Sequence, residues 1–204
     1  MKINNVQKRV LILCEDSKSS LIYFEEFKKD EQLKRLLTAV YIEHPEDYSP
    51  SGLVAEAIRR KDIANRDRNK FDEIWIVLDR NGHANIKEAV NLAYQKKIKV
   101  AISIICFEVW ILLHFERTSK PYEKCDEVIS YIKKKYFSNY DKCSSCFDEL
   151  KPKLPTAIKF AKWLEEQNQN ALDRGDHICE LSSYTNVHHL VEKLLNPNLF
   201  GKDQ

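Results

Sequence analysis

The chain alternates between short apolar runs and longer stretches with helical spacing of apolar residues. Four runs are rich in β-branched and aliphatic side chains: 10–14, 39–42, 74–78 and 98–105. Such uninterrupted runs are typical of strands buried on both faces of a parallel sheet. Three intervening segments carry apolar residues at helical spacing: 19–37, 53–68 and 86–97. This alternation predicts a doubly wound α/β fold with a mainly parallel four-stranded sheet.

Beyond residue 108 the pattern is helical. Apolar residues recur at helical spacing in four further segments: 109–115, 123–137, 154–168 and 184–195. Glycine and proline are scarce, and no repeat or low-complexity tract separates the two halves. We therefore expect an α/β core over residues 1–116 and a helical C-terminal part over 117–204 that packs on the core as one unit.

Two of the predicted strands end on a carboxylate. Glu15 follows the first strand and Asp79 closes the third, with Asn81 two residues further on. Open parallel sheets bind ligands at the carboxyl ends of their strands, so these side chains are expected at one edge. Hard oxygen ligands on a rigid edge suit Mg²⁺, which binds few protein carboxylates and fills its shell with water and substrate phosphate. The pattern predicts metal-assisted chemistry on phosphates.

Charge and composition predict a cytoplasmic protein. The formal net charge of the 204 residues is +2, with acidic and basic residues interleaved, so nucleic-acid contacts must come from local patches. The opening residues lack the apolar stretch of a signal peptide. The longest apolar run, 100–115, is interrupted by polar residues and is shorter than the ~20 residues of a membrane span. In a cytoplasmic protein the six cysteines are expected to be reduced thiols.

One cysteine motif offers a competing interpretation. Cys143 and Cys146 have the C-x-x-C spacing of half a zinc site, and Cys125, His177 and Cys179 could in principle complete it. The halves are loosely spaced, and no zinc-ribbon pattern surrounds them. Two reduced cysteines in a loop are the simpler interpretation.

Four motifs together resemble the RloB family. LCEDSKSSLIYF over 13–24 is similar to its opening CEGxKTExxYF, and VLDRNGH over 77–83 is similar to VFDRDDH. SIICFEVWILLHF over 103–115 is similar to SNPCFExWLLLHF, and TNVH over 185–188 matches TNVHKLVE. The resemblance covers most of the chain in the right order. Glu15 after the first strand and Asp79-x-Asn81 after a later one also resemble the Toprim fold, whose pattern has a glutamate and an Asp-x-Asp at these places.

The resemblance implies a Toprim-type nuclease that acts on DNA or RNA, with tRNA as one candidate substrate, in bacterial anti-phage defence. It implies one or two Mg²⁺ or Mn²⁺ ions held by Glu15, Asp79, Asn81 and Glu108. Lys18 and His83 are further candidate catalytic residues. Lys18 is either a cation near the phosphate or near Glu15, or a solvated side chain, and His83 is a general base, a phosphate contact or a cap. The family also implies an ATPase partner, and the chain has no G-x-x-x-x-G-K-[ST] loop of its own.

The departures from the family pattern support a second hypothesis. Asn81 stands where the family has an aspartate, and Ser20 stands where it has a glutamate, so two acids are missing. Asp16 replaces a glycine and could restore some of that charge. The chain could thus be a catalytically degenerate module that recruits a partner, a nucleic acid or a nucleotide.

Glu108 and His114 lie in the same apolar segment. An unpaired carboxylate buried there would cost several kcal/mol, so we expect Glu108 to have a partner: a metal, His114, Arg80 or a helix N-terminus. His114 follows Trp110 by one helical turn, and we expect it to be a hydrogen-bonded core histidine.

Overall fold

A computed structural model describes residues 8–31, 39–83 and 85–202, and it is built around one five-stranded sheet. The strands lie in the order β2-β1-β3-β4-β5: β1 (Arg9–Cys14), β2 (Ala39–Glu43), β3 (Glu73–Asp79), β4 (Lys99–Ile104) and β5 (Tyr184–Thr185). The first four are parallel, and β5 pairs antiparallel with β4. The α/β class and the parallel strands were predicted from the sequence.

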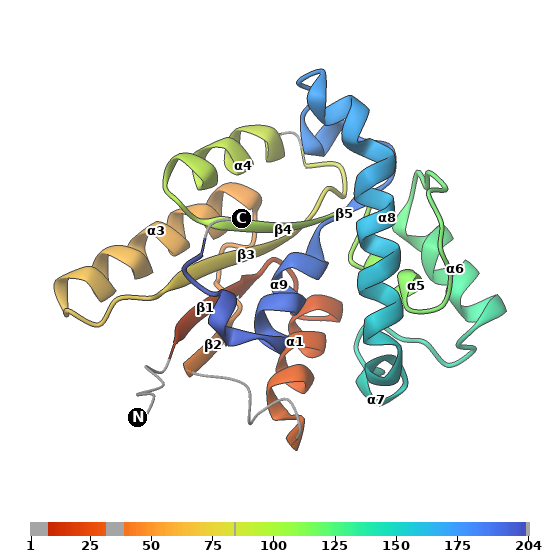
Figure 1. The fold of residues 1–204 in the computed structure, drawn as a ribbon, viewed down its shortest axis with the longest axis horizontal. Helices are drawn as coiled ribbons and strands as arrows, with labels where there is room; N and C mark the ends of the chain where they lie inside the picture. The colour runs from red at the N-terminus through yellow and green to blue at the C-terminus, as the bar shows by residue number, and fades with distance from the viewer. Residues whose placement is uncertain (1–7, 32–38, 84, 203–204) are drawn as a thin grey trace.

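Helices cover both faces of the sheet (Figure 1). On one face, α3 (Pro50–Arg66) and α4 (Ile86–Gln95) pack against alternate strand residues such as Leu11 and Ile76. On the other face, α1 (Ser19–Lys29) and α9 (Val187–Leu195) pack against the intervening strand residues. Burial of both faces explains why the strands lack polar alternation.

The remaining helices extend the core beyond the second face (Figure 1). They are α5 (Glu108–Leu113), α6 (Cys125–Lys135), α7 (Phe147–Leu150) and α8 (Leu154–Asp173), with 3₁₀ turns η1 (Lys151–Lys153), η2 (Ile178–Glu180) and η3 (Pro197–Leu199). The buried apolar side chains of α5, α6, α7 and α8 join the same cluster as those of α1 and α9, whereas Cys179 of η2 belongs to the cluster under α3 and α4.

The prediction of four strands was wrong by one strand. Residues 184–195 were expected to be helical, but Tyr184 and Thr185 form β5 and the helix starts at Val187. The Asn186 side chain is the reason: its Oδ1 accepts a hydrogen bond from the Ile102 N–H (2.7 Å), and its Nδ2 donates to the Val100 carbonyl (3.0 Å). These bonds hold the segment against β4 before the helix begins.

Several helix boundaries also differ from the prediction, and the first two predicted helices are examples. The first helix was expected over 19–37; α1 ends at Lys29, and residues 32–38 lie outside the described part of the chain. The second predicted helix, α3, begins at Pro50 instead of residue 53. Ser49 caps it by accepting a hydrogen bond from the Gly52 N–H (3.1 Å), and proline suits the first helical position.

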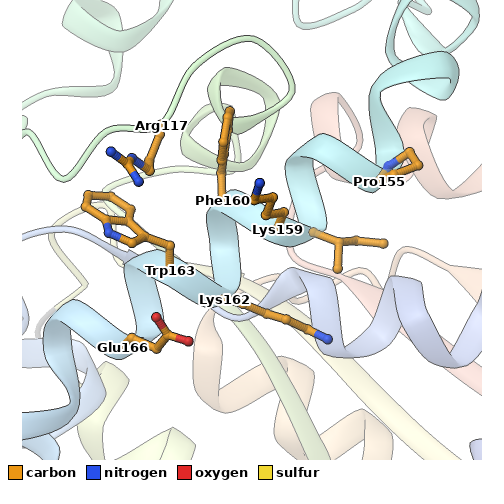
Figure 2. A pocket seen from close by; sticks show the side chains of 8 residues that line it. Arg117, Pro155, Lys159, Phe160, Lys162, Trp163 and Glu166 are labelled. Atoms are coloured by element: carbon orange, nitrogen blue, oxygen red, sulfur yellow. The ribbon is translucent and has the colours of Figure 1, made fainter.

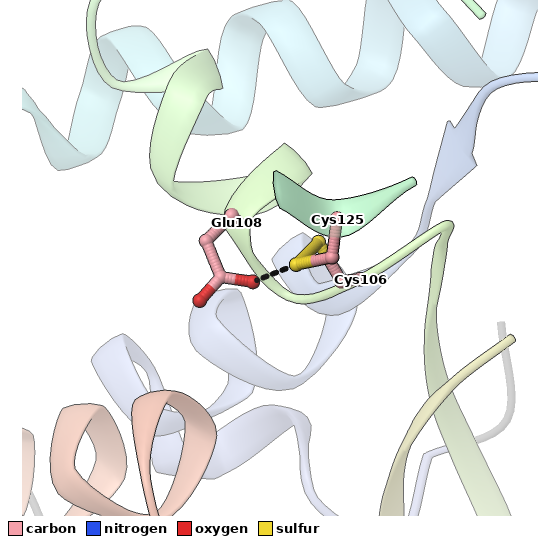
Figure 3. Close-up of side chains that lie close together, drawn as sticks. All are labelled: Cys106, Glu108 and Cys125. Carbon is pink, nitrogen blue, oxygen red and sulfur yellow. Dashed lines mark hydrogen bonds between the residues drawn. A yellow bond between two sulfur atoms is a disulfide. The ribbon is translucent and has the colours of Figure 1, made fainter. Parts of the chain in front are cut away.

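The expectation of six reduced cysteines was also wrong. Cys106 and Cys125 form a disulfide, with their Cα atoms 5.7 Å apart. Cys106 lies between β4 and α5 and Cys125 begins α6, so the packing of α5 against α6 brings them together (Figure 3). The other four cysteines are free.

Among the described helices, none combines the length and the apolar character that a membrane crossing requires.

Candidate active site

Glu15 and Asp79 meet where the strand order reverses. The chain leaves β1 for β2 on one side and returns as β3 on the other, so a crevice opens beyond the carboxyl ends of β1 and β3. The Glu15 N–H donates to the Val77 carbonyl (3.1 Å), and the Asp79 N–H donates to Glu15 Oε2 (2.6 Å). The two acids therefore lie on the same sheet edge, as expected from the sequence.

A cavity of about 480 Å³ opens at this edge. Five of the six candidate residues line it: Glu15, Lys18, Asp79, Asn81 and His83. Six others complete the lining: Asp16, Ser17, His44, Tyr48, Ser49 and Lys142. The cavity thus combines three carboxylates with two lysines and two histidines.

Burial and mutual repulsion make the carboxylates reluctant to ionise. Burial raises the pKa of Glu15 to about 7, against a hydrogen bond from the Asp79 amide, and the Asp16 charge raises it further. Burial likewise raises the pKa of Asp79 well above its usual range, with added repulsion from Glu108 and Glu15. A bound cation would relieve this repulsion and favour the ionised forms.

His83 is placed to act on Glu15. Its Nε2 lies 2.6 Å from Glu15 Oε1, so both oxygens of this carboxylate have a partner. The His83 side chain is 37% exposed, whereas that of Glu15 is 12% exposed. The imidazole therefore lies between the Glu15 carboxylate and solvent.

Asn81 and Lys18 reach the same cavity from two loops. Asn81 follows β3 with a φ of 20°, and its N–H donates to the Ile105 carbonyl (3.1 Å). Its side chain is exposed at the cavity, and Lys18 is exposed just before α1. Both side chains are thus available to a ligand.

Glu108 lies apart from the cavity lining. Its side chain is fully buried, and Oε1 accepts hydrogen bonds from the Ser19 hydroxyl (2.6 Å) and the Tyr140 hydroxyl (3.0 Å). Lys142 Nζ lies 3.3 Å from Oε2. The Cys125 sulfur of the disulfide lies 3.1 Å from the same oxygen (Figure 3).

The expected partners of Glu108 were wrong in part. His114 Nδ1 lies 3.0 Å from the Trp110 carbonyl and is buried, which confirms a core histidine but removes it as a partner. Arg80 donates instead to the Leu181 carbonyl (3.4 Å). Ser19 is the first residue of α1, but it contacts Glu108 through its side-chain hydroxyl and not through the backbone N–H groups of a helix N-terminus.

Three cavity residues could not be found by sequence reasoning. Lys142 comes from a loop without periodicity, yet it lines the cavity and pairs with Glu108. His44 and Tyr48 follow β2, and their rings stack with centroids 4.5 Å apart. The sequence shows only that both residues follow the second parallel strand, which does not by itself indicate a site residue.

The zinc interpretation of Cys143 and Cys146 gains no support. Cys143 is exposed, and neither residue belongs to a cluster of three potential ligands within the described residues. Cys125, one expected partner, is bonded to Cys106.

The donor set at the sheet edge suits a hard divalent cation. Glu15 and Asp79 supply carboxylate oxygens and Asn81 an amide oxygen, in a cavity wide enough for water and phosphate. The nearby lysines can neutralise further negative charge from a phosphate.

The comparisons with known proteins agree with the motifs. A family model described as RloB-like protein matches residues 10–194. No curated protein and no solved structure matches the chain.

Proposed function

The chain belongs to the RloB-like protein family, and from that premise we propose that it is a metal-dependent nuclease of the Toprim type. One observation carries the proposal: Glu15 and Asp79 adjoin at the crevice between β1 and β3, in a cavity that also holds Asn81 and two lysines. Crevices at such reversals of strand order are where open α/β sheets bind ligands.

The residues divide into metal ligands and substrate contacts. Glu15, Asp79 and Asn81 would hold Mg²⁺ or Mn²⁺. Glu108, which is buried and does not line the cavity, is a fourth candidate ligand. When bound, the cation would polarise the scissile phosphate and orient the attacking water. Lys18 and Lys142 would contact phosphate oxygens, and His83 would accept or return a proton through Glu15.

The surroundings of the cavity favour a nucleic acid as substrate. Tyr48 is 51% exposed and stacks on His44, which gives a flat aromatic surface on which a base can stack. A neighbouring cavity of about 630 Å³ shares His44 and is lined by Arg59 and Arg60. Both arginines are paired with Glu56, so phosphates would compete with that carboxylate for them.

We further propose that the chain acts in anti-phage defence beside an ATPase. The support is the family resemblance together with the lack of a phosphate-binding loop in this sequence. Any control of the nuclease by a nucleotide would then have to come from the partner.

A binding module without catalysis is the second candidate, and Asn81 favours it. The chain keeps two of the family's acids at the edge but has an amide at the third position. A neutral ligand holds a divalent ion less firmly than a carboxylate does. Such a site would still bind a phosphate ligand without cleaving it.

The test is cleavage of DNA, single-stranded DNA and tRNA by the purified chain with Mg²⁺, Mn²⁺ or EDTA. We expect metal-dependent products that fall by about a hundredfold or more in Glu15→Gln and Asp79→Asn. Glu88→Gln, which changes an exposed acid on α4, is the matched control.

Metal binding by calorimetry without cleavage, also in the presence of the partner, would favour the binding module. Absence of both would contradict either function.

A further inference from the structure

A second cluster of potential ligands lies away from the sheet edge. Glu165 comes from the middle of α8, and His188 and His189 come from the first turn of α9. One ligand atom of each residue lies within 4.8 Å of those of the other two. His188 is the last residue of the TNVH motif, but neither that motif nor the proposed nuclease site gives this cluster a role.

The distances within the cluster suit a tetrahedral ion. His189 Nε2 lies 3.1 Å from both Glu165 oxygens, and His188 Nε2 lies 3.4 Å from Oε2. Ligands at zinc–nitrogen and zinc–oxygen distances in a tetrahedron are about 3.3 Å apart. Small movements of the side chains would therefore allow one ion to contact all three.

The buried imidazole of His188 is a second observation. The side chain is fully buried, and among the described residues neither ring nitrogen makes a hydrogen bond; the Nε2 contact with Glu165 Oε2 at 3.4 Å lies within the cluster itself. Buried polar groups are rarely left without a partner, and those that are require an explanation.

The carboxylate is oriented from outside the cluster. The Tyr184 hydroxyl donates to Glu165 Oε1 (2.9 Å), the kind of contact that fixes a metal-binding carboxylate. A cavity of about 320 Å³, lined by Glu165, His188 and His189, leaves room for a water or small ligand.

We propose that Glu165, His188 and His189 bind a Zn²⁺ ion, with the fourth position open to this cavity. Two imidazoles and one carboxylate with an open position are a ligand set that zinc adopts in proteins. The ion would join α8 to α9 and would be distinct from the divalent cation proposed at the sheet edge.

The test uses the full chain, stripped with a chelator and titrated with Co²⁺, whose visible absorption reports four-coordinate nitrogen and oxygen ligands. We expect one equivalent to give the four-coordinate spectrum and Zn²⁺ to displace it. His188→Gln, His189→Gln and Glu165→Gln should each weaken binding by at least about tenfold. His189 is 34% exposed, so its variant still tests the site if the buried His188 variant fails to fold.

Two controls assign the signal to this site. Glu166→Gln should keep full binding; Glu166 lines this cavity and also a neighbouring one of about 540 Å³, drawn in Figure 2, but lies outside the cluster. The double variant Glu15→Gln and Asp79→Asn should also keep it, which separates this ion from the proposed nuclease metal. The proposal is overturned if the wild-type chain gives no saturable Co²⁺ spectrum, or if the histidine variants bind as the wild type does.

Discussion

At the scale of single residues, Asn81 is the position where one atom can change the chemistry of the site. Its exposed side chain lines the cavity with Glu15 and Asp79, and it has a small positive φ that aspartate tolerates as readily as asparagine. We predict that Asn81→Asp raises Mg²⁺ affinity several-fold and raises cleavage, because it adds an anionic ligand. Calorimetry measures the affinity; an unchanged value would mean that position 81 does not contact the ion.

Glu108 poses a different question, because its buried contacts can stabilise the fold, serve the site or do both. Glu108→Gln keeps the size but replaces one acceptor oxygen with a donor and removes the ion pair with Lys142. We predict a loss of about 2–3 kcal/mol in the free energy of unfolding. Tyr140→Phe, which removes one of the hydrogen bonds, should cost only about 1 kcal/mol.

Unfolding curves and cleavage rates of the Glu108 variant, each with and without Mg²⁺, separate the roles. Lost cleavage with unchanged stability would identify a metal ligand. Lost stability with retained cleavage would identify a structural anchor. A variant that is both stable and active would contradict both.

His114 makes stability depend on pH. Burial lowers the pKa of His114 to about 4, so the folded protein holds it neutral while the unfolded chain takes up a proton below about pH 6.5. Stability is therefore lost as pH falls from about 6.5 towards 4, by roughly 3 kcal/mol from this group. We predict that His114→Leu is less stable than the wild type at pH 7 but loses less on acidification. Urea unfolding at pH 7 and pH 4.5 measures this; equal losses would contradict it.

At the scale of elements, Asn186 connects α9 to the sheet. Its side chain satisfies one N–H and one carbonyl of β4 that would otherwise be buried without partners. We predict that Asn186→Ala lowers the free energy of unfolding by about 2–4 kcal/mol. The exposed Asn198 near the same helix is the matched control, with little change expected for Asn198→Ala. Equal effects of the two substitutions in urea unfolding would remove Asn186 as an anchor.

The strand next to Asn186, β5, could not be predicted from the sequence. The strands on either side of the crevice were predictable because their apolar runs are long and each ends on an acid, Glu15 or Asp79. Strand β5 has two residues, too few for a period, and its pairing depends on β4 far away in sequence. The partners of Glu108 were equally hidden, since Tyr140 and Lys142 lie in an irregular loop that only tertiary packing brings near.

At the scale of the whole molecule, the C-terminal part completes the α/β core. Helices α9 and α1 lie on the same face of the sheet, and α9 covers the part of that face that α1 does not cover. Strand β5 extends the sheet beside β4. Lys193 Nζ, near the end of α9, lies 2.5 Å from Glu73 Oε1 at the start of β3, and the Gly201 N–H donates to the same oxygen (2.9 Å). Both ends of this last helix are therefore bonded to parallel strands.

This arrangement predicts that residues 1–116 do not fold without residues 117–204. The shortened chain would lose β5, α8 and α9, and with them part of the buried cluster to which Val10 of β1 and Val77 of β3 belong. Since burial of apolar surface is the main source of stability, we expect no cooperative unfolding transition in the fragment. The full chain should unfold in one transition by circular dichroism and by tryptophan fluorescence. A fragment that unfolds cooperatively would instead establish the first 116 residues as an independent domain, with the helical part as a separate addition.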